Sequence, residues 1–164
     1  MLKYIFVGAV SLICLNLIKM SAINKIRDRW EGPLQDIGYT LHIGHHNFCK
    51  DGVDGQHSRH EKKIWACQSA DFLNTVIAHE TVHALQATKR TMEPLFTPRV
   101  HRVIRDQVRV PQSPEDFQYL TEIEAYYLQK KSQTVLQLLK TKAEDRRQFR
   151  KQVNVLADNI IKKK

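Results

Sequence analysis

The stretch Ala70–Thr88, ADFLNTVIAHETVHALQAT, contains no proline or glycine and repeats apolar residues at the spacing of an α-helix. Residues three and four positions apart lie on the same face of a helix, so the pattern predicts one helix with a core-facing side. Ser69 is placed to cap the N-terminus of this helix. The apolar residues that recur at this spacing are Phe72, Leu73, Val76, Ile77, Val82 and Leu85.

The same stretch carries His79-Glu80-Thr81-Val82-His83, which matches the H-E-x-x-H pattern of zinc sites. His79 and His83 are four residues apart, so both imidazoles lie on one face of the helix and can reach one ion. Glu80 is placed beside the ion, where it can accept a proton from a bound water molecule. The motif therefore predicts a Zn²⁺ site with His79 and His83 as ligands and Glu80 as the catalytic base.

A catalytic zinc ion usually has three protein ligands, so another element must supply the third one. The candidates are Glu122 and Glu124, which lie in the segment TEIEAY at 121–126. Helical periodicity places Glu124 on an apolar face, and a buried carboxylate needs a partner such as a metal ion. Glu122 shares its face with more polar neighbours. The choice between the two glutamates stays open on these residues alone.

An H-E-x-x-H helix followed by a helix with E-x-x-A resembles the gluzincin-type metallopeptidases. The chain is most similar to the mitochondrial metalloprotease family that processes an ATP synthase subunit, through the segments 64–67, 79–83 and 121–125 in that order. This resemblance covers roughly residues 64–126. It implies that Glu122 is the third metal ligand, and Glu124 is then a candidate for orienting a ligand histidine. Tyr126 stands where related membrane peptidases typically have an aspartate after the alanine.

The order of patterns along the chain predicts an α+β fold. A short helix over 23–37 should be followed by strands at Tyr39–Ile43 and Ile64–Cys67, with a polar loop between them. Within residues 90–113 one short helix is indicated by the spacing of Val100, Val103, Ile104 and Val108. Ser113 and Pro114 predict the start of a long helix that reaches Thr141, and a last helix should cover Glu144–Ile161. We expect a minimal zincin-like domain over residues 23–164, with a small sheet beside the H-E-x-x-H helix, a second long helix bearing the glutamates and a mainly helical C-terminal half.

Residues 1–22 differ from the rest of the chain in composition. The apolar run at 4–18 suits the core of a signal peptide better than a full membrane span of about 20 residues. The positive charges that follow the run favour retention on the cytoplasmic side of a membrane instead. We therefore expect a signal peptide or an N-terminal membrane anchor, so that the protein is exported or attached to a membrane on a side left open. The alternative is an ordinary core helix.

The net charge is +9 over 164 residues, with 26 lysines and arginines against 17 acidic residues. Such an excess is compatible with nucleic acid, an anionic membrane or an acidic substrate. No nucleic-acid motif accompanies it, so nucleic acid is not an expected partner. The expected partners are a protein or peptide substrate and a membrane that residues 4–18 would contact.

Two cysteines remain beyond residue 22, and Cys49 and Cys67 are compatible with one disulfide or with two free thiols. The histidines between and around them do not follow a spacing known for zinc, so they are expected at the surface or in loops. This set is His42, His45, His46, His57 and His60. Three further residues are candidates for stabilising an oxyanion: His101, Tyr126 and Tyr127.

Taken together, these patterns predict a zinc metallopeptidase in which Glu80 activates the attacking water. One alternative is a zincin-like domain that binds metal or a partner without peptide hydrolysis. Another is a membrane-attached basic adaptor in which the HETVH sequence is accidental.

Overall fold

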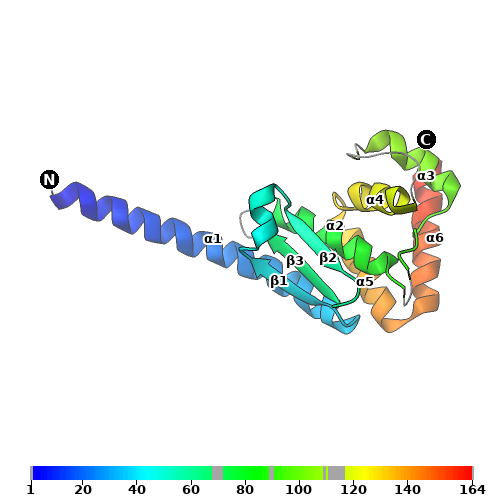
Figure 1. Cartoon of the computed structure of the whole chain (residues 1–164), viewed down its shortest axis with the longest axis horizontal. Helices are drawn as coiled ribbons and strands as arrows, with labels where there is room; N and C mark the ends of the chain where they lie inside the picture. The colour runs from blue at the N-terminus through cyan, green and yellow to red at the C-terminus, as the bar shows by residue number, and fades with distance from the viewer. Residues whose placement is uncertain (1, 68–71, 89–90, 109, 111–116, 164) are drawn as a thin grey trace.

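The computed structural model describes residues 2–67, 72–88, 91–108, 110 and 117–163, with side chains described in these ranges except at 2–15 and 117–118. The chain is an α+β protein, as the sequence predicts, with a small sheet followed by helices (Figure 1). The elements are α1 (Leu2–Asp36), β1 (Thr40–Gly44), the 3-10 helix η1 (Asn47–Asp51), β2 (Gly55–Ser58), β3 (Lys63–Cys67), α2 (Leu73–Gln86), α3 (Pro98–Ile104), the 3-10 helix η2 (Arg105–Gln107), α4 (Phe117–Leu128), α5 (Ser132–Glu144) and α6 (Arg146–Lys162).

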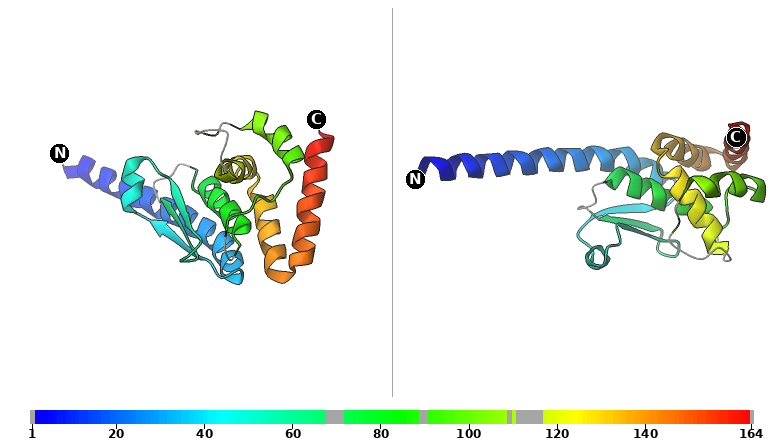
Figure 2. Two further views of the ribbon diagram at one scale, coloured as in Figure 1. Left: turned by 45° about the vertical axis from the view of Figure 1, so that its right-hand side comes forward. Right: turned by 90° about the horizontal axis from the view of Figure 1, so that it is seen from above.

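The sheet has the order β1-β3-β2, with β1 parallel and β2 antiparallel to β3. Helices α1 and α2 lie on one face of it (Figure 2, right). That face carries the buried side chains of Leu41, Ile64 and Ala66. The strand β2 was not predicted, because its sequence GQHS lacks the alternation of apolar residues that marks a half-buried strand. It lies at the edge of the sheet, where pairing with β3 is sufficient to hold it extended.

The core forms between the sheet, α1 and α2, and α5 packs against both of these helices. Trp30 and Leu34 from α1, Ile77 from α2 and Leu139 from α5 are completely buried there. Trp30 also donates a hydrogen bond from its indole nitrogen to Oδ1 of Asn74, at 2.9 Å. This contact fixes the position of α1 against α2, the helix that carries HETVH.

Helix α1 differs from the prediction of a short helix over 23–37 that is separate from residues 1–22. It is continuous from Leu2, includes Gly32 and Pro33, and ends at Asp36. Proline costs the helix one hydrogen bond, and the complete burial of Trp30 and Leu34 on either side offsets that loss. The N-terminal part of α1 extends away from the other elements (Figure 1).

Within the part of the chain that the structure describes, no helix combines the length and the apolar character that a membrane crossing requires. The assignment of residues 1–22 as a signal peptide or anchor stays a prediction.

The helix that carries HETVH is shorter than predicted. It begins at Leu73 and ends at Gln86, because Phe72 and Ala87 have non-helical backbones. Ser69 and Ala70, the predicted cap and start, lie outside the described residues.

The predicted long helix from Pro114 to Thr141 is two helices, α4 and α5, separated at residues 129–131. The backbone dihedral angles of Lys131 are not helical. Both helices pack against α2, but α4 also contacts α3, whereas α5 also contacts α1 and α6. The expected cap at Ser113 lies outside the described residues.

Helix α6 begins at Arg146, two residues later than predicted, because the Asp145 side chain caps it by accepting a hydrogen bond from the backbone N–H of Arg147.

Candidate metal site

Three side chains from α2 and α4 meet in the position expected of metal ligands. The Nε2 atoms of His79 and His83 are 3.2 Å apart, and the Glu122 carboxylate lies 3.4 Å from the first and 3.2 Å from the second. Four donors arranged tetrahedrally at about 2.0 Å from a zinc ion are about 3.3 Å from one another. The spacing of the three donors therefore fits one shared ion, and this group could hold a metal.

A hydrogen bond to a glutamine holds each histidine ring. Nδ1 of His79 donates to Oε1 of Gln129 at 3.0 Å, and Nδ1 of His83 donates to Oε1 of Gln86 at 2.8 Å. Because the amide oxygen only accepts, Nδ1 carries a proton whether or not the ring is charged, and Nε2 is the nitrogen that can bind a metal once it has lost its own proton. The two glutamines were not identified from the sequence.

Glu124 lies behind the site and not in it. Its side chain is completely buried and accepts hydrogen bonds from the backbone of Leu95 and Phe96, from Gln86 and from His101. It therefore reaches His83 through Gln86, which is the orienting role considered for it. The structure brings Glu122, not Glu124, to the two histidines.

The three clustered groups change one another's affinity for protons. Burial alone would raise the pKa of Glu122, but the hydrogen bonds from His79 and His83 outweigh it and hold that pKa well below its usual range. Burial alone would lower the pKa of His83, but Glu122 and Glu80 raise it above the ordinary value. The cluster thus favours a negative carboxylate next to a cation, which is the charge pattern that a bound metal ion would reinforce.

Glu80 is buried beside these donors, beneath the edge strand β2. Burial raises its pKa, and the neighbouring His79 and His83 oppose the rise. Gly55 is required above it: a Cβ at this position would lie 2.6 Å from Cγ1 of Val76 and 3.1 Å from the Glu80 side chain. The missing side chain lets β2 approach α2 closely enough to cover the predicted catalytic base.

Two hollows open on either side of Glu80. One, of about 700 Å³, is lined by Glu80 with both histidines and Glu122; the other, of about 760 Å³, is lined by Glu80 with His79 and Tyr126. Gly55, His79 and Glu80 belong to both hollows. The site is therefore a cleft that passes across the base, with room for a ligand on both sides.

His57, which was expected at the surface or in a loop, is half-buried on a strand. It lies on β2 and lines the hollow that contains both histidines, with its ring centroid 6.1 Å from that of His83 and its Nε2 3.1 Å from the Tyr39 hydroxyl. Burial, followed by the charges of His83 and nearby lysines and arginines, lowers the pKa of His57 to about 3. At neutral pH it presents an uncharged imidazole to the cleft.

The three candidates for stabilising an oxyanion lie in different parts of the structure. Tyr126 lies at the cleft, with its ring centroid 4.8 Å from that of His79, and burial together with Glu122 and Glu80 raises its pKa. His101 is instead buried against Glu124, at 2.7 Å. Tyr127 packs under the Lys131 ammonium, on a different surface. Only Tyr126 is placed to act on a ligand.

Cys49 and Cys67 form a disulfide, with Cα atoms 5.9 Å apart. It links η1 to the end of β3 and so closes the segment that contains β2. The remaining loop histidines, His42, His45, His46 and His60, belong to no metal-binding group among the described residues.

Comparisons of this chain with protein family models, with curated proteins and with solved structures found no match. The function proposed below is therefore argued from the site.

Proposed function

We propose that the chain is a zinc-dependent metallopeptidase. The observation that carries the proposal is the convergence of His79, His83 and Glu122 at the spacing of one tetrahedral ion, with Glu80 buried beside them. Three protein ligands leave a fourth position open, which distinguishes catalytic zinc sites from structural ones. Nitrogen and carboxylate donors in this number favour zinc over calcium or magnesium, which take mostly oxygen ligands.

When bound, zinc supplies Lewis acidity that polarises a carbonyl and lowers the pKa of water to about 7. The Glu80 carboxylate accepts the proton of the attacking water and passes it to the nitrogen of the leaving amine. Its raised pKa suits the first step, because a carboxylate whose pKa is raised is a stronger base toward the water. The Tyr126 hydroxyl donates a hydrogen bond to the developing oxyanion.

A peptide is the preferred substrate because of the shape of the site. The hollows on both sides of Glu80 give room for a chain that continues beyond the reacting bond in two directions. The strand β2 is at the sheet edge beside the cleft, and such an edge can pair with an extended peptide.

The test is hydrolysis of a mixed peptide library by the zinc-loaded full chain, followed by mass spectrometry. We expect new peptide ends with the native chain and a loss of rate of about 100-fold or more with Glu80→Gln, which keeps the shape but removes the base. Equal cleavage by both proteins would indicate a contaminating protease. If the chain binds zinc but cleaves no peptide, the peptidase assignment fails and the alternative of a metal-binding domain without peptidase turnover stands.

We also propose that the N-terminal part of α1 directs export or membrane attachment. Leu17, Ile18 and Met20 support this, because each is more than half exposed on the extended part of the helix. In cell fractionation the full chain should be found in the membrane or exported fraction and a chain lacking residues 2–18 in the cytosol. The same distribution for both would contradict the proposal.

A further inference from the structure

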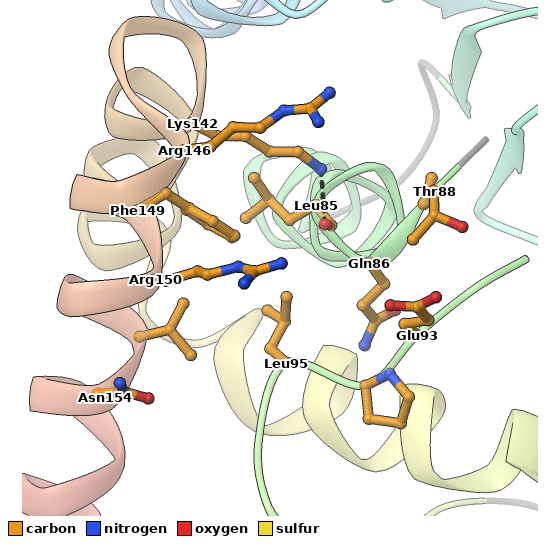
Figure 3. Close-up of a pocket in the computed structure, with 13 residues that line it drawn as sticks. Leu85, Gln86, Thr88, Glu93, Leu95, Lys142, Arg146, Phe149, Arg150 and Asn154 are labelled. Atoms are coloured by element: carbon orange, nitrogen blue, oxygen red, sulfur yellow. Dashed lines mark hydrogen bonds between the residues drawn. The ribbon is translucent and has the colours of Figure 1, made fainter.

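A line of connected hollows leads from the candidate metal site to α6. The hollow of about 700 Å³ at the metal site shares Arg59 with a second of about 800 Å³. The second shares Lys142 and Arg146 with a third of about 570 Å³, which Figure 3 shows. Since adjoining hollows have these residues in common, we treat them as one channel along the surface, the basic groove.

Five cationic side chains line the basic groove. Arg59 and Lys62 come from the turn between β2 and β3, Lys142 from the end of α5, and Arg146 and Arg150 from α6. In Figure 3 the last three reach from α5 and α6 across the hollow toward the end of α2. They outnumber the carboxylates that line the second and third hollows, which are Asp36, Glu93 and Glu144. The first hollow is lined by Glu80 and Glu122 of the candidate metal site.

These five charges are not neutralised by ion pairs among the described residues. Lys62 lies over the ring of Tyr39, and Lys142 donates to the backbone carbonyls of Ala84 and Leu85. Burial, together with the nearby Lys62 and Arg146, lowers the pKa of Lys142 to about 8. Like charges held this close in a partly enclosed groove create a positive potential that attracts anions.

The direction of β2 connects this potential to the site. Gly55 lies against Glu80 at one end of the strand, and Arg59 directly follows the other end. At about 3.3 Å per residue, Arg59 is about 13 Å, or four residues, along the strand from the base. A peptide paired with the free edge of β2 would reach Arg59 with its fourth residue from the reacting bond, and residues beyond it would approach Lys62 and Lys142.

We propose that the ligand of this cleft is an acidic polypeptide, with aspartate or glutamate residues beginning about four positions from the reacting bond on one side and bound along the basic groove. The cleavage of this polypeptide rests on the proposed function, but its binding does not. Arginine suits the role because its planar guanidinium group binds carboxylates through two parallel hydrogen bonds.

The experiment compares two fluorescent peptides that are identical except that four glutamates in one flank are replaced by glutamines. Their binding to the zinc-loaded Glu80→Gln chain, which retains the ligand uncut, is measured by fluorescence anisotropy. We expect the glutamate peptide to bind at least 10-fold more tightly. The triple variant R59Q/R146Q/R150Q should abolish that difference, and high salt should reduce it.

The matched control is R147Q/K151Q/K162Q, which removes the same charge from exposed positions of α6 outside the groove. It should keep the preference for the glutamate peptide. An equal loss in both triple variants would overturn the proposal, because net charge alone would then explain the binding. The proposal would also be overturned if a single-stranded oligonucleotide of equal charge bound as tightly and its binding depended on the same three arginines.

Hydrolysis by the native chain separates this proposal from the proposed function. If the glutamate preference is present in binding but neither peptide is cleaved, the peptidase assignment fails and the groove assignment stands. If both peptides are cleaved at the same rate and bind equally, the groove assignment fails alone.

Discussion

The two glutamines behind His79 and His83 decide which ring nitrogen would be available to a metal ion. Gln86 is nearly completely buried, and its amide donates to Glu124 and to the backbone carbonyl of Thr121 while its oxygen accepts from His83. It has no freedom to turn without losing these bonds. The orientation of His83 is therefore set by the packing of α2 against α4.

Gln86→Met keeps the volume of this side chain and removes the hydrogen bond to His83. We expect the affinity for zinc to fall by about 10- to 100-fold, the usual effect of losing a partner of a ligand histidine. Competition with a zinc chelator of known affinity measures the change. Gln133→Ala is the control, because Gln133 is exposed on α5; a zinc affinity for Gln86→Met equal to that of this control would contradict the orienting role.

The sequence predicted the ligands that lie within one helix better than the residues that support them. His79 and His83 follow from helical spacing alone, and Gln86 carries a local signal because it is three residues from His83 on the same helix. Gln129 and His57 could not be found in this way. They reach the site only through the packing of α4 on α2 and the pairing of β2 with β3.

At the scale of elements, Glu124 joins helix α4 to the segment before α3. It accepts four hydrogen bonds, two of them from the backbone of residues 95 and 96. Glu122, two residues earlier in α4, is partly exposed, and its ion pairs among the described residues are with His79 and His83. Glu124 therefore supports the packing of α4, whereas Glu122 contributes to the candidate metal site.

Glu124→Ala should lower the free energy of unfolding by about 3–5 kcal/mol, because four buried donors lose their acceptor. Glu122→Ala should change the stability of the metal-free chain by about 1 kcal/mol or less, since its side chain is partly solvated. Urea unfolding of both zinc-free variants checks the contrast. If Glu124→Ala does not fold, Glu124→Gln, which keeps one acceptor oxygen, takes its place and should have a lower free energy of unfolding than Glu122→Ala. Equal stability of the variants would contradict the assigned roles.

The order of elements could be predicted because most of them carry a clear local pattern. The strands β1 and β3 and helix α6 lie within about two residues of their predicted positions, and α3 lies inside the segment 90–113 in which one short helix is predicted. The division between α4 and α5 had no such signal, since no proline or glycine marks residues 129–131. It follows from the different helices against which the two segments pack.

At the scale of the whole molecule, the disulfide between Cys49 and Cys67 closes an 18-residue segment that includes β2 and Gly55. The sequence left this bond and two free thiols equally open, because pairing depends on a distance in space. With the bond formed, the edge strand over Glu80 is held at its start by η1 and along its length by β3.

The double variant Cys49→Ser/Cys67→Ser should lower the free energy of unfolding by about 3 kcal/mol, the amount expected for a closed segment of this length. Thermal and urea unfolding of the oxidised native chain and the variant give the difference. The native chain treated with a reductant provides the control, and it should match the variant. No change in stability on reduction would show that the bond does not constrain the chain.

The central claim is that one zinc ion is shared by side chains from two helices, and zinc stoichiometry tests it most directly. Inductively coupled plasma mass spectrometry should find about one zinc per native chain after dialysis, as expected for a site with three protein ligands. His79→Ala, His83→Ala and Glu122→Ala should each lose most of this zinc, and Glu124→Gln should retain more than any of the three. A native chain without zinc, or zinc retained equally when His83 is replaced, would contradict the account.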